Sequence, residues 1–327
     1  MTWRVACAAR ATIGKRANQE DAFAIWPSGS ETATKDGRGL LAVVADGMGG
    51  HAGGEIAGDL ACRTFVSRFS QTTAAPGERF EAALEAANSA IATRGSQNPR
   101  LDGMGCTLIG AWIDETGLCW VSVGDSLLLL FRAPNVLRLN ADHSLGAFLD
   151  EQARRGKISK AEAEKNLYRN ALRSAVTGKV IELKELQTKP YPLSEGDWLI
   201  IASDGIATLT GDEIGDVIYR NRSASPETVA DALIAAVLEK GTPDQDNTTV
   251  VAIKIAAGRA SHAADETPTR ILHSGPVSLS PREGQGATTR RILQPPKQLL
   301  SRQSGAMIAA AMGLMFFVGW LVRAWLD

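Results

Sequence analysis

Residues 40–58, LLAVVADGMGGHAGGEIAG, contain the pattern that decides the fold. The apolar run LLAVVA is typical of a strand that is buried on both faces, and it ends in Asp46. Five of the eight residues after Asp46 are glycines, which let the backbone come close to another group. The stretch therefore predicts a strand that leaves the core and delivers a carboxylate to a site.

Similar apolar runs recur along residues 1–257. They predict further strands in CTLIGAWID (106–114), LCWVSVGD (118–125), LLLLFR (127–132), DWLIIASDG (197–205) and NTTVVAIKI (247–255). The segment IDETGLCW predicts a hairpin loop between two of these strands. Helical spacing of apolar residues predicts helices within 55–69 and 78–95, the second ending at Gly95. Strands grouped in this way indicate layered sheets covered by helices rather than a strict βαβ alternation.

Composition and charge exclude several classes of protein. The chain has 327 residues, of which 44% are hydrophobic and 22% charged, which is ordinary for a globular protein. A net charge of −1 gives no basic field, so we expect no nucleic-acid partner. The four cysteines form no CxxC pair and are expected to be buried thiols in a reducing compartment. The N-terminus lacks an apolar segment long enough for a signal peptide.

The composition changes after residue 257. Residues 258–303 are rich in Ser, Thr, Pro, Gly and Gln, which predicts a flexible linker. Residues 305–322, GAMIAAAMGLMFFVGWLV, are uncharged and would span about 27 Å as a helix. We therefore predict a transmembrane helix over 304–323, because a buried terminal helix would normally show a polar face. Basic residues precede this run and no acid occurs from 284 to 326, which predicts a cytoplasmic N-terminal domain.

Four aspartates share one position relative to the predicted strands. Asp46, Asp125 and Asp204 each end an apolar strand, and Asp246 lies just before one. One such residue alone would usually be a turn or cap residue. Four acids at strand ends can converge on one edge of a sheet, where they repel and need protons or cations. A set of oxygen donors without Cys or paired His suits Mg²⁺ or Mn²⁺, and the glycines after Asp46 would let a backbone carbonyl face the metal.

Two other kinds of site are disfavoured. Gly47, Gly49 and Ala52 match the dinucleotide fingerprint G-x-G-x-x-G/A, but Asp46 would repel a pyrophosphate. Residues 66–71, VSRFSQ, also lack the acid that would bind the ribose. The four histidines show no HxxxH spacing, which disfavours zinc.

Eight motifs in order along the chain resemble those of the type 2C metal-dependent serine/threonine protein phosphatases, most closely the bacterial branch. They are RANQED (16–21), VADGMGGHAGGEIA (44–57), GCTLIGAWI (105–113), VGDS (123–126), DHS (142–144), RNALRSAVTG (169–178), LIIASDGI (199–206) and DNTTVVAI (246–253). The resemblance implies an α+β fold, a four-layer α/β/β/α sandwich of two antiparallel sheets flanked by helices. Residues 1–257 would form the catalytic domain, with 146–178 as a flap beside the active site.

The resemblance also implies a set of metal ligands. Asp46 would bridge two Mn²⁺ or Mg²⁺ ions, and the backbone carbonyl of Gly47 would complete one site. Asp204 and Asp246 would complete the other, and Asp125 would share a third, weaker ion with Asp204.

Other residues would act around these metals. Arg16 resembles the arginine that holds the substrate phosphate. Glu20 and Asp21 would orient water bound to the metals, and Asn247 would belong to the same shell of residues around the metal ligands.

The implied activity is hydrolysis of phosphoserine and phosphothreonine in proteins, opposing a serine/threonine kinase. The expected partners are phosphorylated proteins, such a kinase and its substrates, and a membrane reached through the C-terminal helix. The alternative is a catalytically weak scaffold of the same fold that binds phosphoproteins, which the intact acids disfavour. The oligomeric state stays open.

Three positions depart from the family pattern. Met48 stands where eukaryotic members have a histidine, so no general acid is assigned, and His51 and His143 are better explained as structural residues. Leu127 replaces the usual arginine after GDS, and Cys106 stands where Thr or Ser is usual.

The 146–178 segment is polar and charged. Ser159 and Glu162 form an S-x-x-E capping box, which predicts a small helical excursion. Its basic residues are either a solvated helix face or a docking site for phosphoproteins, namely Arg154, Arg155, Lys157 and Lys160.

Overall fold

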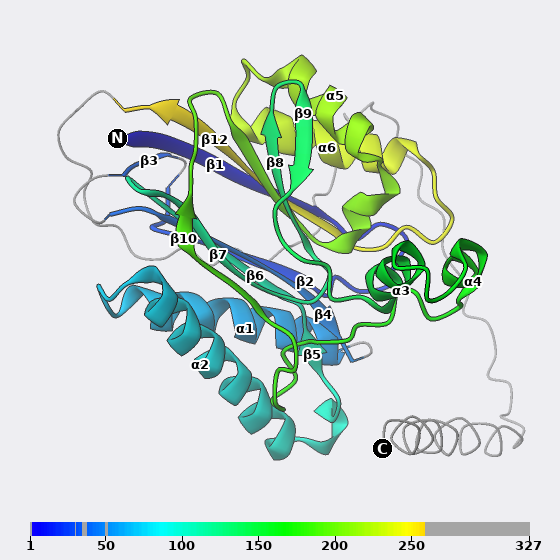
Figure 1. The fold of residues 1–327 in the computed structure, drawn as a ribbon. Helices are drawn as coiled ribbons and strands as arrows, with labels where there is room; N and C mark the ends of the chain where they lie inside the picture. The colour runs from blue at the N-terminus through cyan, green and yellow to red at the C-terminus, as the bar shows by residue number, and fades with distance from the viewer. Residues whose placement is uncertain (1, 30, 35–37, 50–51, 259–327) are drawn as a thin grey trace, which may run out of the picture. The chain divides into compact units, whose positions relative to one another are not determined.

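Two antiparallel sheets lie face to face in the computed structural model, which describes residues 2–29, 31–34, 38–49 and 52–258 (Figure 1). The strands of the first sheet have the order β3-β1-β12-β11-β8-β9. Their bounds are β1 Trp3–Thr12, β3 Glu31–Ala33, β8 Leu127–Arg132, β9 Asn135–Arg138, β11 Trp198–Ala202 and β12 Thr248–Ala257.

The second sheet has the order β10-β7-β6-β4-β2, and the short strand β5 pairs with the end of β4. Its strands are β2 Asp21–Trp26, β4 Leu40–Met48, β5 Gly105–Cys106, β6 Leu108–Asp114, β7 Gly117–Val123 and β10 Glu185–Tyr191. The predicted hairpin is confirmed, because Asp114 of β6 lies opposite Gly117 of β7.

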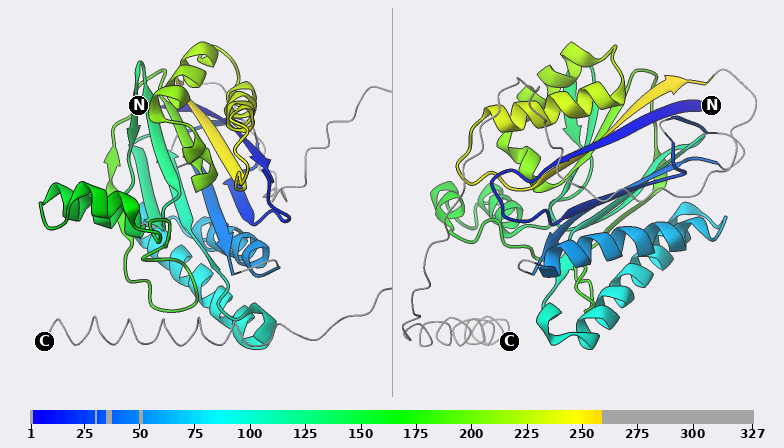
Figure 2. Two further views of the ribbon diagram at one scale, coloured as in Figure 1. Left: turned by 90° about the vertical axis from the view of Figure 1, so that its right-hand side faces the viewer. Right: turned by 180° about the vertical axis from the view of Figure 1, so that it is seen from behind.

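Each sheet is covered by a pair of helices, which gives the expected four layers (Figure 2). Helices α1 (Ala52–Ser70) and α2 (Pro76–Gln97) pack on the second sheet, and α5 (Gly211–Asn221) and α6 (Pro226–Glu239) pack on the first. Two 3-10 helices, η1 (Pro99–Leu101) and η2 (Asp204–Thr208), follow α2 and β11. The fold class predicted from the resemblance is thus confirmed for the two sheets and their flanking helices.

Strand β4 shows why its sequence is apolar at every position. Leu40, Ala42 and Val44 belong to the core between the two sheets. The alternate residues face the other way, and Leu41 and Val43 belong to the core beneath α1 and α2. Successive side chains of a strand point to opposite faces, so a strand with a sheet on one side and helices on the other is buried throughout.

The expected end of the second helix at Gly95 is wrong. Helix α2 continues to Gln97, and the N–H of Asn98 donates to the carbonyl of Gly95. Asn98 has extended backbone angles and is followed by Pro99, which disfavours a helical conformation at the preceding residue. The proline therefore ends the helix, and the glycine lies inside its last turn.

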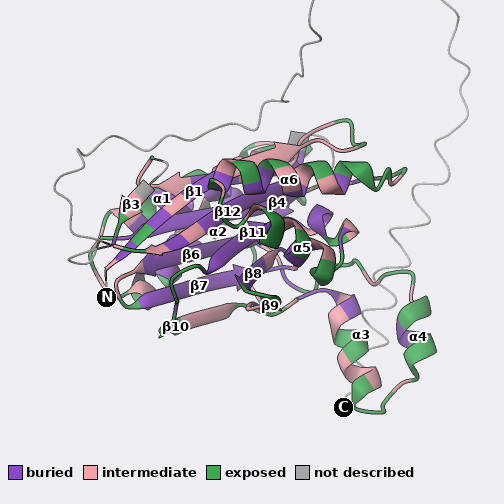
Figure 3. Ribbon diagram, turned by 90° about the horizontal axis from the view of Figure 1, so that it is seen from above, coloured by how far each residue is buried: buried purple, intermediate pink, exposed green. Residues whose placement is uncertain are grey.

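The polar segment after β9 forms the predicted helical excursion. It contains α3 (Leu145–Arg154) and α4 (Lys160–Lys165), which show mostly exposed and half-buried residues (Figure 3). The capping box at the start of α4 is confirmed, since Ser159 and Glu162 exchange side chain-to-backbone hydrogen bonds.

The last strand, β12, ends at Ala257, close to the predicted domain boundary. No helix within the described ranges is long and apolar enough to cross a membrane. The predicted transmembrane helix (304–323) and, apart from Gly258, the predicted linker (258–303) lie outside the described residues.

Candidate metal centre

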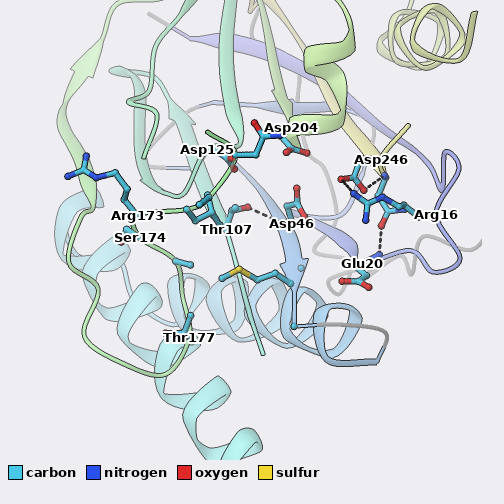
Figure 4. A pocket seen from close by; sticks show the side chains of 18 of the residues that line it. Arg16, Glu20, Asp46, Thr107, Asp125, Arg173, Ser174, Thr177, Asp204 and Asp246 are labelled. Carbon is cyan, nitrogen blue, oxygen red and sulfur yellow. Dashed lines mark hydrogen bonds and ion pairs between the residues drawn. The ribbon is translucent and has the colours of Figure 1, made fainter. Parts of the chain in front are cut away.

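The four strand-end acids line one cavity of about 1160 Å³ (Figure 4). Asp46 comes from the end of β4, Asp125 from the turn after β7, Asp204 from the start of η2 and Asp246 from the residues before β12. All four are half-buried. The convergence predicted from their positions at strand ends is therefore present in the fold.

Thr107 fixes the backbone of Asp46. The Asp46 N–H donates to Thr107 Oγ1 at 3.0 Å, and the Thr107 N–H donates to the Asp46 carbonyl at 2.9 Å. Thr107 Oγ1 also lies 2.7 Å from the buried Ser126 Oγ, next to Asp125. These bonds join the ends of β4 and β7, so two of the acids are held relative to each other.

Gly47 is required by packing. A Cβ atom at this position would lie 2.1 Å from the Gly54 carbonyl and 2.5 Å from the Glu20 carbonyl, and neither backbone atom can easily move. The missing side chain lets the end of β4 pass close to the first turn of α1. This is the close approach of the backbone that the glycines after Asp46 predicted.

The turn that carries Asp125 is held from two sides. The Arg138 guanidinium donates to the carbonyls of Asp125 (2.8 Å) and Ser126 (3.2 Å) and to the carboxylate of Asp142 (2.9 Å). On the other side, His143 exchanges two hydrogen bonds with Gly124, one through its ring Nδ1 and one through its backbone. Arg138 is the last residue of β9 and His143 lies between β9 and α3, so this part of the chain positions the turn.

The two remaining acids have different surroundings. Asp204 Oδ1 is buried and has no hydrogen-bond partner among the described residues. The carboxylate of Asp246 accepts a bond of 2.5 Å from Arg16 Nη2 and one of 2.8 Å from the N–H of Asn247. Arg16 therefore supplies the positive charge beside Asp246, whereas Asp204 keeps a buried oxygen without a partner.

The cluster raises the pKa of its own carboxyl groups. Burial raises the pKa of Asp46 well above its ordinary value, and the nearby Asp21, Asp204, Asp125 and Asp246 raise it further. Burial, followed by Asp204, raises the pKa of Asp125 to about 7. Burial and Asp246 raise the pKa of Asp204. The ionised carboxylates lack compensating charge, which is the electrostatic setting that a bound cation relieves.

The donor set fits divalent cations by its chemistry. All the converging side-chain donors are carboxylate oxygens, which Mg²⁺ and Mn²⁺ prefer, and the oxygen of Asp204 is unsatisfied. In the described part of the chain, no group of three or more His, Cys, Asp or Glu side chains is close enough together to hold a metal ion as it stands. In this arrangement the Asp246 carboxylate is paired with Arg16.

The other predicted site residues lie around the acids. Arg16, Glu20 and Asn247 line the same cavity. The Asn247 side chain donates to the carbonyls of Ile13 and Asn18 and accepts from the Glu20 N–H, so it holds the loop that carries Arg16 and Glu20.

Asp21 does not line the cavity but lies behind it. It is 4% exposed and stands directly opposite Asp46 in the β2–β4 pairing. Its Oδ2 accepts a hydrogen bond from Ser203, and burial raises its pKa to about 7. Two like charges at opposed positions of neighbouring strands destabilise each other, so Asp21 adds to the need for a cation at Asp46.

Two of the three departures from the family pattern, Cys106 and Leu127, are accommodated by packing, whereas Met48 lines the cavity. His143 is buried and burial lowers its pKa, so its ring is neutral and holds the Asp125 turn as a structural residue. Cys106 is fully buried in β5, and Leu127 packs against the core beneath α5 and α6. His51 lies outside the described residues.

The basic residues of α3 and α4 are mostly neutralised by their own helices. Arg154 and Arg155 pair with Glu151, and Lys160 pairs with Glu164, each within one turn. This pairing favours the interpretation of a solvated helix face for these three residues.

Comparisons with known proteins agree on one family. The family model described as protein phosphatase 2C matches residues 10–240. The serine/threonine phosphatase stp of Listeria welshimeri is 32% identical over 235 residues, which cover 69% of this chain and 88% of that protein.

Solved structures give the same result. The crystal structure of the Mycobacterium tuberculosis serine/threonine phosphatase PstP/Ppp is 28% identical, with a TM-score of 0.63, and the match covers 78% of this chain and 100% of that one. A structure of the catalytic domain of PstP in complex with two manganese ions is also 28% identical, with a TM-score of 0.62 and the same coverage.

Proposed function

This chain belongs to the protein phosphatase 2C family, and we propose that it hydrolyses phosphoserine and phosphothreonine esters of proteins with two Mn²⁺ or Mg²⁺ ions. The observation that carries this proposal is the convergence of four strand-end acids on one cavity that Arg16 also lines. A scaffold that only binds phosphoproteins is not favoured, because all the acids are present.

Asp46, Asp204 and Asp246 would hold the two metal ions, together with the carbonyl of Gly47, and Asp125 would add a third, weaker site with Asp204. When bound, the ions lower the pKa of water and neutralise the phosphoryl oxygens. Hydrogen bonds hold the backbone at Asp46 and Asp125, and the N–H of Asn247 donates to the Asp246 carboxylate.

Arg16 would bind the substrate phosphate. Its side chain is 57% exposed at the cavity, and its guanidinium donates one hydrogen bond to Asp246. A guanidinium can donate two parallel hydrogen bonds to a phosphate, which a lysine cannot. With Asp246 holding a metal ion, Arg16 would be available to donate to the phosphoryl oxygens.

The same proposal extends to the cellular setting. The uncharged run at 305–322, preceded by basic residues, supports a C-terminal membrane anchor that keeps the catalytic domain on the cytoplasmic side. Such an anchor would raise the local concentration of the enzyme near membrane-bound kinases and their substrates. Membrane fractionation of the full chain and of residues 1–257 tests this point, because only the full chain should sediment with membranes.

The activity is tested with a phosphothreonine peptide in three arms: with Mn²⁺, with excess chelator, and with the Asp204→Asn variant in Mn²⁺. We expect release of phosphate in the first arm and its loss in the other two. Binding of the peptide without turnover in the first arm would instead favour the scaffold, and turnover unaffected by chelator would reject the metal mechanism.

A further inference from the structure

The cavity has a basic region in addition to its acid cluster. Residues 170–182, which connect α4 to β10, supply much of its remaining lining. Among them, Arg173, Lys179 and Glu182 are exposed at the surface. Figure 4 shows the Arg173 guanidinium pointing away from the four aspartates. The cavity therefore offers positive charge at a place that is separate from the acids.

The positive charge of this region is not neutralised within the described chain. The Arg173 guanidinium lies over the ring of Phe148, 4.3 Å from its centroid, and neither Arg173 nor Lys179 forms an ion pair with a described acid. Lys184, just beyond this region, pairs with Glu81. A guanidinium stacked on a ring keeps its N–H groups free at its edge, where an anion can accept them.

The backbone of the region is held in place. The Arg173 N–H donates to the His143 carbonyl at 2.8 Å. Asn88 on α2 accepts from the Gly178 N–H and donates to the Lys179 carbonyl, both at 2.8 Å. Gly178 has φ +78, and a Cβ there would meet the backbone of Ala92, so the turn is closely packed on α2. A backbone already fixed loses little entropy when a ligand binds.

We propose that Arg173 and Lys179 form a subsite for a second anionic group on the phosphopeptide substrate, either a carboxylate or a further phosphoryl group. The inference rests on the proposed function, since it places the reacting phosphate at the acid cluster of the same cavity. Both anions accept charge-assisted hydrogen bonds from guanidinium and ammonium groups. Glu182 lies in the same wall and repels such an anion, so it limits the affinity of the subsite.

The test uses a series of phosphothreonine peptides in which one flanking residue in turn is Gln, Glu or a non-hydrolysable phosphonate analogue of phosphoserine. With the wild-type chain, we expect a lower KM for the anionic peptides at one or two flanking positions. The double variant Arg173→Gln/Lys179→Gln should raise that KM by about three- to tenfold, with kcat unchanged. Hydrolysis of the Gln peptide and of p-nitrophenyl phosphate should stay within about twofold, because neither carries a second anionic group.

Two further variants sharpen the result. Glu182→Gln should lower the KM for the anionic peptides, which is the opposite direction. Arg154→Gln/Lys160→Gln removes the same amount of charge from α3 and α4 and should leave the preference unchanged. The proposal is wrong if no position distinguishes Glu from Gln, or if both double variants weaken the anionic peptides equally. If the wild type hydrolyses none of the substrates, the proposed phosphatase activity is itself wrong. If it hydrolyses all of them without a preference for the anionic peptides, only the subsite is wrong.

Discussion

Two charged regions of this protein differ in how their charge is compensated. At the end of the sandwich, Asp46, Asp125 and Asp204 are half-buried at one cavity, and burial together with neighbouring acids raises their pKa values. On α3 and α4, the basic side chains are exposed, and Arg154 and Lys160 each have an acid within one turn of the helix.

The strand-end acids carry charge that a bound cation would neutralise, whereas the charges on α3 and α4 are already paired at the surface. A half-buried carboxylate without a cation costs stability, so a fold retains several together only where something binds them. An exposed pair one helical turn apart contributes little and costs little. Uncompensated charge therefore points to function more reliably than the density of charge along the sequence.

The largest effect is expected from the centre of the acid cluster. Asp46→Asn should lower kcat/KM for a phosphothreonine peptide by roughly 10³-fold, because it removes the carboxylate that is proposed to bridge the two metal ions. The matched control is Asp216→Asn on α5, an exposed residue paired with Arg220, which should leave the rate unchanged. An Asp46→Asn enzyme of wild-type activity would remove the distinction between the two charged regions.

A smaller effect is expected from the residue that holds the Asp125 turn. Arg138→Gln should weaken the weakest Mn²⁺ site by about 10–100-fold, since groups behind metal ligands contribute that much. Arg132→Gln is the control, because Arg132 pairs with the buried Asp197 away from the cavity. It should lower the free energy of unfolding without changing Mn²⁺ affinity, which a titration and a urea melt would separate. Equal losses of affinity in both variants would contradict the assigned role of Arg138.

The pH dependence of metal stabilisation follows from the raised pKa values. In the metal-free fold, the pKa values of Asp21 and Asp125 are about 7, above the unfolded values, so the folded state binds more protons between about pH 4 and pH 7. These groups therefore make the metal-free protein less stable as pH rises through that window. Because protons and Mn²⁺ compete, the rise in Tm on adding Mn²⁺ should be larger at pH 7.5 than at pH 5.5. A rise that is the same at both pH values would show that protonation of this carboxyl cluster does not compete with Mn²⁺ binding.

The smallest effect is expected from a substitution on helix α3. Arg154→Gln should change the free energy of unfolding by no more than about 0.5 kcal/mol, because exposed pairs contribute little and Glu151 retains Arg155. Its kcat/KM for p-nitrophenyl phosphate should also match that of the wild type. A loss of activity would show that this helix takes part in the reaction despite its local pairing.

Much of the site could be predicted from the sequence because its acids directly follow strongly apolar strands. The apolar runs before Asp46, Asp125 and Asp204 have no competing explanation, and strand geometry fixes where their last residues lie. Arg138 and Thr107 could not be found in this way, because their roles depend on hydrogen bonds between distant segments. The placement of Asp21 behind Asp46 likewise depends on the register of β2 and β4.

The elements that the sequence analysis missed have weaker patterns. Strand β1, WRVACAARAT, is rich in small residues and arginine, and the edge strand β10, ELQTKPY, is largely polar. Helices α5 and α6 did carry a readable signal. Thr210 and Glu213 form a capping box like that of α4, and Ser225 caps α6 ahead of Pro226.

The most direct test of the central claim is a calorimetric titration of the chelator-treated chain with Mn²⁺, without any substrate. If the strand-end acids hold the ions, the wild type and Asp216→Asn should bind about two ions per chain tightly. Asp46→Asn should lose this tight binding while keeping a cooperative thermal transition. Unchanged Mn²⁺ stoichiometry and affinity in a folded Asp46→Asn chain would contradict the account.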